Sequence, residues 1–223
     1  MTSDVFVIVA AYNEADRIAA TLAALAEAFP GASLWVADDG SEDGTGIAAE
    51  AAGAKVVRSE RVIGKGGAVT LAAREALASE GLVALLCDGD LGESAARLGP
   101  LVEAVHRGES DLAVAAFSRR VGGGFGLAVG FAHWAIRRRC GLVLRAPISG
   151  QRALRTDTLA QVLPFAYGFG MEIGMTIDAA RAGARVEEID LDLSHRATGR
   201  TLGGFLHRGR QLIDFMRVYI SRR

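Results

Sequence analysis

Short apolar runs alternate with alanine-rich segments along the first half of this 223-residue chain. The runs have the length and bounding turn residues of strands, and they lie at residues 5–10, 34–37, 55–57, 82–87 and 112–116. Apolar residues at helical spacing predict helices at residues 15–29, 66–79 and 98–105. Ser41 and Asp43 are alternative caps for a further helix that runs through residue 52. This alternation is typical of βαβ units, so we predict an α/β fold with a mostly parallel sheet flanked by helices.

The pattern changes in the second half of the chain. Three glycines at residues 122–124 predict a loop, and a basic, apolar segment follows at residues 127–145. The remaining predicted elements are a helix at 171–182, a strand at 186–193 and a final helix at about 202–220. Neither internal repeats nor a linker composition divides the chain, so we expect one domain of residues 1–223.

Composition excludes several classes of protein. The 25 Lys and Arg residues balance 26 Asp and Glu, so a net charge of −1 gives no global attraction to nucleic acid. Cys87 and Cys140 are too few for a disulfide framework and lack the spacing of a zinc cluster. The N-terminus has no export signal, and the apolar stretch at residues 125–136 is shorter than the ~20 residues of a membrane-spanning helix. We therefore expect a cytoplasmic protein without a spanning segment.

Four polar clusters follow predicted strands or precede a predicted helix, at residues 12–14, 38–41, 64–67 and 88–90. Open α/β sheets bind their ligands at the carboxyl ends of the strands. We therefore expect the four clusters to meet at one edge of the sheet and to form a single site.

Among these clusters Asp88-Gly89-Asp90 gives the strongest indication of a site, because it follows a predicted strand that is apolar throughout. Two carboxylates one residue apart offer hard oxygen ligands to a divalent cation, and Gly89 lets the backbone approach a ligand closely. The alternative is an ordinary polar turn, since such tripeptides are common. Because the other clusters share the edge, we favour a Mg²⁺ or Mn²⁺ site that neutralises a leaving diphosphate.

The other clusters suit a nucleotide. Asp38 and Asp39 form either a plain turn or a set of acceptors for a base and a ribose. Lys65 lies between glycines just ahead of a helix, where it is placed to meet phosphate. The glycines around Lys65 do not have the G-x-x-x-x-G-K-S/T spacing of a P-loop, which argues against an ATPase. The first strand is not followed by G-x-G-x-x-G, which argues against a dinucleotide-dependent oxidoreductase.

The chain resembles family 2 glycosyltransferases of the GT-A fold, near the dolichol- and polyprenyl-phosphate sugar synthases. The resemblance rests on the runs AAYNEADRI, VADDGSEDGT, GKGGA, CDGDL, SGQRALR, FGMEIG and HRATGR. It implies a donor-binding half at residues 1–116, an acceptor-binding half at 117–200 and an amphipathic helix at 201–223. It also implies a UDP- or GDP-sugar donor held by Ala11, Tyr12, Glu14, Asp39, Lys65, Asp88 and Gly89.

One departure and a second likeness bear on the acceptor and the metal. The polyprenyl-phosphate enzymes usually carry Gln at the position of Gly92. The runs PISGQRALR, LPFAYGFGMEIG and LSHR also resemble the glucosyl-3-phosphoglycerate synthases. By that likeness His195 would join Asp88 and Asp90 as a metal ligand, and a purely structural histidine is the alternative.

Glu172 and Asp90 are the expected catalytic residues. Glu172 begins a predicted helix whose N-terminus faces the ligand edge, so its carboxylate would orient a sugar hydroxyl or act as a base. The alternative is a Glu that only stabilises the first turn of the helix. Backbone donors or guanidinium groups would bind a phosphate-bearing acceptor, and the candidates are Arg119, Ser149, Gly150, Arg196 and Arg200.

Two surfaces combine apolar and basic residues. One is the last helix, with arginines off a face formed by Leu202, Phe205, Leu206, Leu212, Ile213, Met216, Tyr219 and Ile220. The other joins Phe131, Trp134 and Ile136 to the arginines at 137–139 and to Arg145. Such surfaces suit packing on the core, contact between the copies of a homodimer, or peripheral contact with the inner face of an anionic membrane.

The leading hypothesis is metal-dependent transfer of a sugar from a nucleotide-sugar to polyprenyl phosphate. A small soluble acceptor such as a phosphorylated acid is the alternative within the same class of enzyme. A nucleotidyltransferase would carry a glycine-rich, basic loop after its first strand, where this chain has Ala11-Tyr12-Asn13-Glu14. A non-catalytic binding module would have no use for Asp88, Asp90 and Glu172 together.

Overall fold

The computed structural model describes residues 4–78, 81–117, 127–193 and 214–222. These residues contain a seven-stranded sheet in the order β3-β2-β1-β4-β6-β5-β7. Its strands are β1 Val5–Ala11, β2 Ser33–Asp38, β3 Lys55–Arg58, β4 Val83–Asp88, β5 Leu112–Phe117, β6 Arg152–Arg155 and β7 Val186–Leu191. The helices are α1 Ile18–Ala28, α2 Thr45–Ala51, α3 Lys65–Ala76, α4 Gly99–His106, α5 Leu127–Cys140, α6 Thr156–Val162 and α7 Met171–Arg181. Two short 3₁₀ helices are η1 Gly92–Leu98 and η2 Gly168–Gly170.

The sheet is mostly parallel, which confirms the predicted fold class. Only β6 runs antiparallel to its neighbours β4 and β5. Neither β6 nor α6 was predicted, because β6 is four residues long and a charged residue, Arg152, begins it. The strand therefore offers neither an apolar run nor an apolar–polar alternation to recognise.

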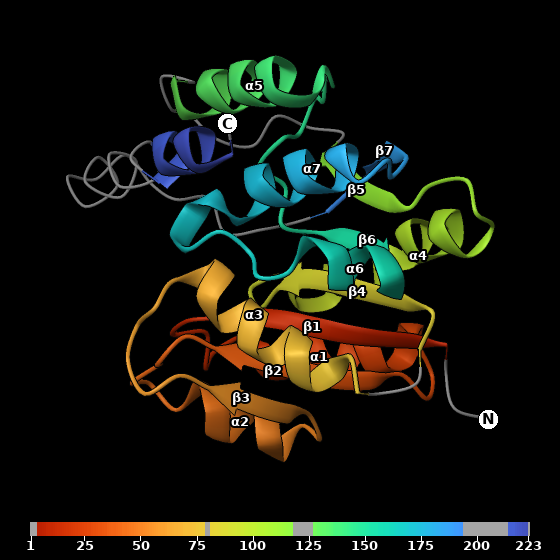
Figure 1. Cartoon of the computed structure of the whole chain (residues 1–223). Helices are drawn as coiled ribbons and strands as arrows, with labels where there is room; N and C mark the ends of the chain where they lie inside the picture. The colour runs from red at the N-terminus through yellow and green to blue at the C-terminus, as the bar shows by residue number, and fades with distance from the viewer. Residues whose placement is uncertain (1–3, 79–80, 118–126, 194–213, 223) are drawn as a thin grey trace.

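Helices cover both faces of the sheet (Figure 1). Alternate residues of β1 point to opposite faces. Val5, Val7 and Val9 belong to a buried cluster formed with α1, η1 and α4. Phe6 and Ile8 belong to a second cluster formed with α3, α6 and α7. Each of these side chains is almost fully buried, which stabilises the fold by about 1.5–3 kcal/mol per large side chain.

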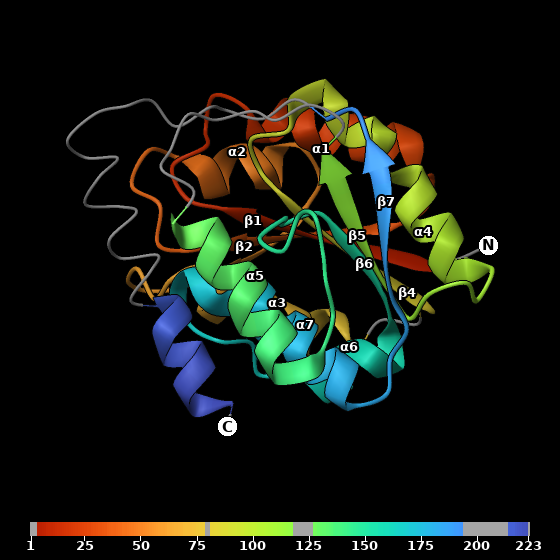
Figure 2. The same cartoon turned by 90° about the horizontal axis from the view of Figure 1, so that it is seen from above.

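A further layer lies outside α7, where α5 and the helical residues 214–221 run side by side (Figures 1 and 2). A third buried cluster joins the three helices, with Ile136 from α5, Ile173 and Ile177 from α7, and Phe215 and Val218 from the last helix. Helix α7 is therefore buried between the sheet and this outer layer. Its first seven residues are all buried, as expected of a helix enclosed on all sides.

The last helix differs from its prediction in the face that it buries. Phe215 and Val218, which lie outside the predicted apolar face, contact α7, whereas Met216 and Ile220 are exposed. The close approach of this helix to η2 explains the shift, since a side chain at Gly170 would overlap Val218. Residues 202–213 of the predicted helix lie outside the described residues. None of the helices in the described ranges has the length and apolarity needed to cross a bilayer.

Candidate active site

The loops that follow β1 and β2 are joined to each other by hydrogen bonds. The Asn13 N–H donates to Ser41 Oγ at 3.0 Å, and the Glu42 N–H donates to Asn13 Oδ1 at 3.0 Å. The Glu14 N–H donates to Thr45 Oγ1 at 2.9 Å. Ser41 is therefore not the cap of α2; Asp43 Oδ1 accepts the Thr45 N–H in the first turn instead. The two polar clusters meet at one edge, as the sequence predicts.

Asp39 links this edge to the loop ahead of α3. Its carboxylate accepts the backbone N–H groups of Ile63 at 2.7 Å and Gly64 at 2.9 Å. Burial raises the pKa of Asp39, and these two hydrogen bonds only partly offset that rise. In contrast, the Tyr12 side chain at the same edge is half exposed. Asp39 thus holds the loop that delivers Lys65, and Tyr12 presents a ring to solvent.

Lys65 bridges two carboxylates from distant parts of the chain. Its Nζ lies 2.6 Å from Asp88 Oδ1 and 2.7 Å from Glu172 Oε1. Burial would lower the pKa of Lys65, but the two carboxylates outweigh it, so the pKa is raised. Lys65 begins α3, Asp88 ends β4 and Glu172 lies in the first turn of α7. The three elements therefore converge on one ammonium group.

The strand β6 brings a fourth segment to this ion cluster. Its antiparallel register pairs Leu86 with Arg152, so Gly150 lies beside Asp88. A Cβ on Gly150 would lie 2.5 Å from both Asp88 Oδ2 and Lys65 Nζ, so a larger residue there would displace these two charged groups. Gln151 donates from Nε2 to Asp88 Oδ2 at 2.8 Å. Gln151 was missed as a site residue, although it stands in the run SGQRALR, because only the register of an unpredicted strand places it there.

The Asp88-Gly89-Asp90 turn is held against the start of α1. The Gly89 N–H donates to Ala10 O at 2.8 Å, and Thr21 Oγ1 donates to Gly89 O at 2.7 Å. Asp90 is partly buried, and its carbonyl accepts from Arg17 at 3.1 Å. No three His, Cys, Asp or Glu side chains of the described residues form a metal-binding group. The turn thus carries two carboxylates that are separated by a single residue.

The family model "Glycosyl transferase family 2" matches residues 6–160, from β1 into α6. The chain belongs to glycosyl transferase family 2. It is therefore a glycosyltransferase, and the polar clusters at residues 12–14, 38–41, 64–67 and 88–90 all lie within the matched range.

Two curated members of the family are similar over most of the chain. An undecaprenyl-phosphate mannosyltransferase of Micrococcus luteus is 32% identical over 88% of this chain and 86% of its own length. A glucosyl-3-phosphoglycerate synthase of Mycolicibacterium paratuberculosis is 32% identical over 77% of this chain, which spans 58% of that relative. Both likenesses read from the sequence motifs are thereby confirmed.

A solved structure of glucosyl-3-phosphoglycerate synthase from Mycobacterium tuberculosis confirms the GT-A fold. It has a TM-score of 0.80 and 30% identity, covering 99% of this chain and 78% of the other. That crystal structure is a complex with Mn²⁺, uridine diphosphate and phosphoglyceric acid.

The structure brings most of the predicted family 2 site residues together at one edge of the sheet. These are Ala11, Tyr12, Glu14, Asp39, Lys65, Asp88, Gly89, Asp90, Ser149, Gly150 and Glu172. Four other predicted residues lie outside the described residues, namely Arg119, His195, Arg196 and Arg200. Their roles in acceptor and metal binding stay predictions.

Proposed function

We propose that this glycosyltransferase moves a sugar from a UDP- or GDP-sugar to the phosphate of a polyprenyl phosphate, with Mg²⁺ or Mn²⁺ bound by Asp88 and Asp90. The carrying observation is the ion cluster of Lys65, Asp88 and Glu172 at the edge where four loops meet. Lys65 and Asp88 are suited to a diphosphate and its metal ion, and the carboxylate of Glu172 is suited to a sugar or an acceptor.

The residues present fit the proposed metal. Mg²⁺ is commonly bound by one or two carboxylates together with substrate phosphates, rather than by a cage made of protein alone. Asp88 and Asp90 supply two carboxylates from one turn, and among the described residues no third His, Cys, Asp or Glu joins them in a metal-binding group. The remaining ligands would be donor phosphate oxygens and water, with His195 as the predicted exception. When bound, the cation would neutralise charge on the leaving diphosphate.

The chain's own residues would position the reacting groups. An acceptor phosphate oxygen is already ionised at neutral pH, so no proton needs to be removed before it attacks the anomeric carbon. The new C–O bond forms as the bond to the diphosphate breaks, and the electron pair leaves with the diphosphate. Glu172, held by Lys65, would orient a sugar hydroxyl rather than act as a base. Ser149 and Gly150 would face the acceptor from the loop that precedes β6.

A surface outside the site supports a lipid acceptor. The rings of Phe131, Trp134 and Tyr219 form a cluster, with 4.6 Å between the Trp134 and Tyr219 centroids. Trp134 is 49% exposed, and the exposed Arg137 and Arg138 follow it on α5. Half-exposed aromatic rings beside arginines suit the interface of an anionic membrane. The relative named as acting on undecaprenyl phosphate also matches the chain over nearly the full length of both.

A second candidate acceptor is a small soluble phosphorylated acid. The structure similar over 99% of this chain was solved with phosphoglyceric acid, which favours this alternative. Its hydroxyl would have to lose a proton, so Glu172 would then act as a base.

The two acceptors can be separated by direct assay. The purified protein would be given Mn²⁺ and labelled UDP-glucose or GDP-mannose, with either undecaprenyl phosphate in anionic vesicles or 3-phosphoglycerate in buffer. We expect label in the lipid fraction. Turnover of the soluble acid without dependence on vesicles would overturn the lipid acceptor, and release of pyrophosphate would indicate a nucleotidyltransferase.

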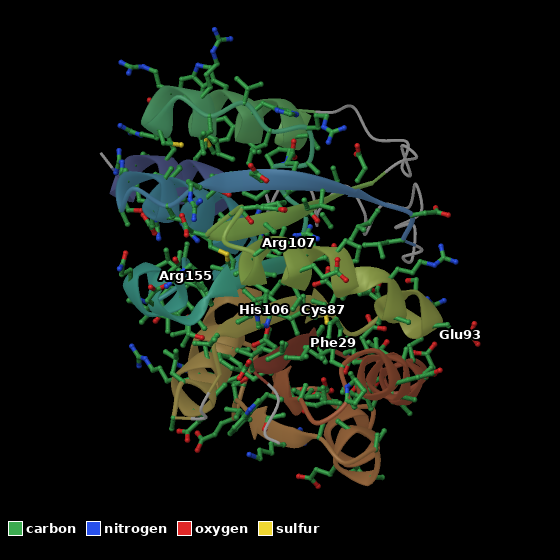
Figure 3. The ribbon with its side chains drawn as sticks, turned by 90° about the vertical axis from the view of Figure 1, so that its right-hand side faces the viewer. Phe29, Cys87, Glu93, His106, Arg107 and Arg155 are labelled. Carbon is green, nitrogen blue, oxygen red and sulfur yellow. The ribbon has the colours of Figure 1, made fainter. Side chains whose placement is uncertain are left out.

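Replacement of one carboxylate tests the metal site separately. Asp90→Ala should abolish metal-dependent binding of the donor in calorimetry and leave the melting temperature nearly unchanged, because the Asp90 side chain is only partly buried. The matched control is Glu93→Ala, since Glu93 is an exposed carboxylate three residues away at the edge of the molecule (Figure 3). Unchanged, Mn²⁺-dependent affinity in Asp90→Ala would refute the assignment.

A further inference from the structure

Arg152 is a fully buried arginine behind the ion cluster. It begins β6 and is 0% exposed, and it is one of the largest fully buried side chains of the protein. Adjacent residues of a strand point to opposite faces of the sheet. Gln151 contacts Asp88 at the site, so Arg152 points the other way, into the protein.

The guanidinium of Arg152 donates to two segments that both line the site. Its Nε donates to Ser149 O at 2.8 Å and its Nη2 to Pro147 O at 3.1 Å. Its Nη1 donates to Thr176 Oγ1 at 2.9 Å. Thr176 Oγ1 in turn donates to Glu172 O at 2.9 Å, inside α7. One side chain thus connects the loop at residues 147–150 to the turn of α7 that carries Glu172.

The cost of burying this charge indicates a role other than stability. Among the described residues, no Asp or Glu forms an ion pair with Arg152. Burial lowers the pKa of Arg152 to about 10, and the more distant Glu172 and Glu188 only partly oppose that effect. Apolar residues of similar volume often stabilise a protein as well as, or better than, a buried charge. A buried guanidinium with neutral acceptors is instead suited to fixing several groups in one geometry.

We propose that Arg152 is a positioning residue for sugar transfer, which sets the separation between the Ser149-Gly150 backbone and Glu172. On one side it fixes the loop that brings Gly150 against Asp88. On the other side it fixes the helical turn from which Glu172 reaches Lys65. The inference rests on the proposed function for its catalytic consequence, because the two segments are those that would face the acceptor and the sugar.

Two variants and one control test the inference. Arg152→Met removes all three hydrogen bonds and fills the buried position with an unbranched apolar side chain. Thr176→Val removes the hydrogen bond from Arg152 and the one that Thr176 donates to Glu172 O, while the bonds of Arg152 to residues 147 and 149 stay, so it is a milder change if Arg152→Met folds poorly. The control is Arg155→Met, on the same strand but exposed and bonded to Asp157 (Figure 3).

The measurements separate positioning from folding. Donor affinity and stoichiometry by calorimetry count the correctly folded sites, and turnover is expressed per donor-binding site. We expect Arg152→Met to keep donor affinity within about 2-fold and to lose roughly 30-fold or more in turnover per site, in the range expected when reacting groups are misplaced by about 1 Å. Arg155→Met should match the wild type. Unchanged turnover per site in Arg152→Met, or a loss explained by a lower donor stoichiometry, would overturn the proposal.

Hydrogen exchange gives a readout that needs no turnover. In Arg152→Met the amides of residues 147–150 and 171–176 should exchange faster, while those of β1 keep their protection. In Thr176→Val the increase should be confined to α7. If the wild type transfers no sugar to any phosphate acceptor, the proposed function fails. Unchanged exchange in both segments of Arg152→Met would instead refute the structural link made by Arg152.

Discussion

Removal of the Lys65 ammonium should unbalance the site in a measurable way. In Lys65→Met, Asp88 and Glu172 would keep their negative charges without the cation that lies 2.6 Å and 2.7 Å from them. Only 22% of the Lys65 side chain and 8% of the Glu172 side chain are exposed, so water would replace the lost cation poorly. We therefore expect Lys65→Met to lose affinity for the donor as well as stability.

The magnitude follows from the burial of the cluster. Removing one partner of a buried ion pair costs about 3–5 kcal/mol. Because Asp88 is one-third exposed, the lower end applies, and we expect a loss of about 3 kcal/mol in the free energy of unfolding. For a chain of this size, that corresponds to a fall of roughly 6–12 °C in Tm.

A double-mutant cycle in urea would measure the pair directly. Glu172→Gln added to Lys65→Met removes one of the two orphaned charges, so the double variant should be more stable than additivity predicts, by about 1–3 kcal/mol. Arg155→Met serves as the control, because its exposed pair with Asp157 should contribute nothing measurable. An additive cycle would refute the reasoning.

The pH dependence provides an independent check. The pKa of Lys65 is raised above its ordinary value of 10.5 in the folded protein. Its contribution to stability is therefore complete below pH 10.5 and is lost only as the pH rises through the folded-state value. The stability difference between wild type and Lys65→Met should stay constant through neutral pH and shrink in strong alkali. A difference that disappears at neutral pH would mean that Lys65 is not held by carboxylates.

Three further predictions concern the backbone, an ion pair and the metal. Gly150→Ala should reduce turnover at least ~10-fold, because its Cβ would lie 2.5 Å from Asp88 Oδ2; Gly99→Ala, with no atom within 4 Å, should be neutral, and equal activities would contradict the close approach. The side-chain hydrogen bond from Arg185 lowers the pKa of Asp111 in the folded protein, so the stabilisation that ionised Asp111 provides is lost as the pH falls below 3.8. In Asp111→Asn the free energy of unfolding should therefore fall less steeply with acid than in the wild type. EDTA should abolish donor binding but leave Tm without donor unchanged; a large fall in Tm would indicate a structural metal instead.

The meeting of the polar clusters at one edge of the sheet could be predicted from the sequence, because local patterns determine it. The apolar run that ends at Asp88 is recognisable as a buried strand, and the carboxyl ends of parallel strands share one edge. The polar clusters around Tyr12, Asp39, Lys65 and Asp90 therefore had to lie near one another once the sheet was assumed. In the structure, hydrogen bonds and an ion pair join these clusters to one another at that edge.

The contacts within the site could not be predicted in the same way. Lys65 and Glu172 are 107 residues apart in sequence, and no local sequence pattern predicts their ion pair. Arg152 stands in the run SGQRALR, but the sequence does not indicate that this residue is buried, because arginine is mostly exposed in folded proteins. Asp39 was expected to contact a nucleoside, and its bonds to Ile63 and Gly64 depend on a loop with no recognisable pattern.

The reversed direction of β6 gives the enzyme two independent entries to the same edge. The parallel strands β1, β2 and β4 end at this edge, so the residues that follow them lie there. The antiparallel strand β6 begins at the same edge, so Gly150 and Gln151, which precede it, lie there too. The described part of the segment between β5 and β6, residues 127–151, contains α5 and leads back to this edge at Gly150. Under the proposed function, a change of this segment would alter the surface offered to the sugar acceptor without altering the loops that follow β1, β2 and β4.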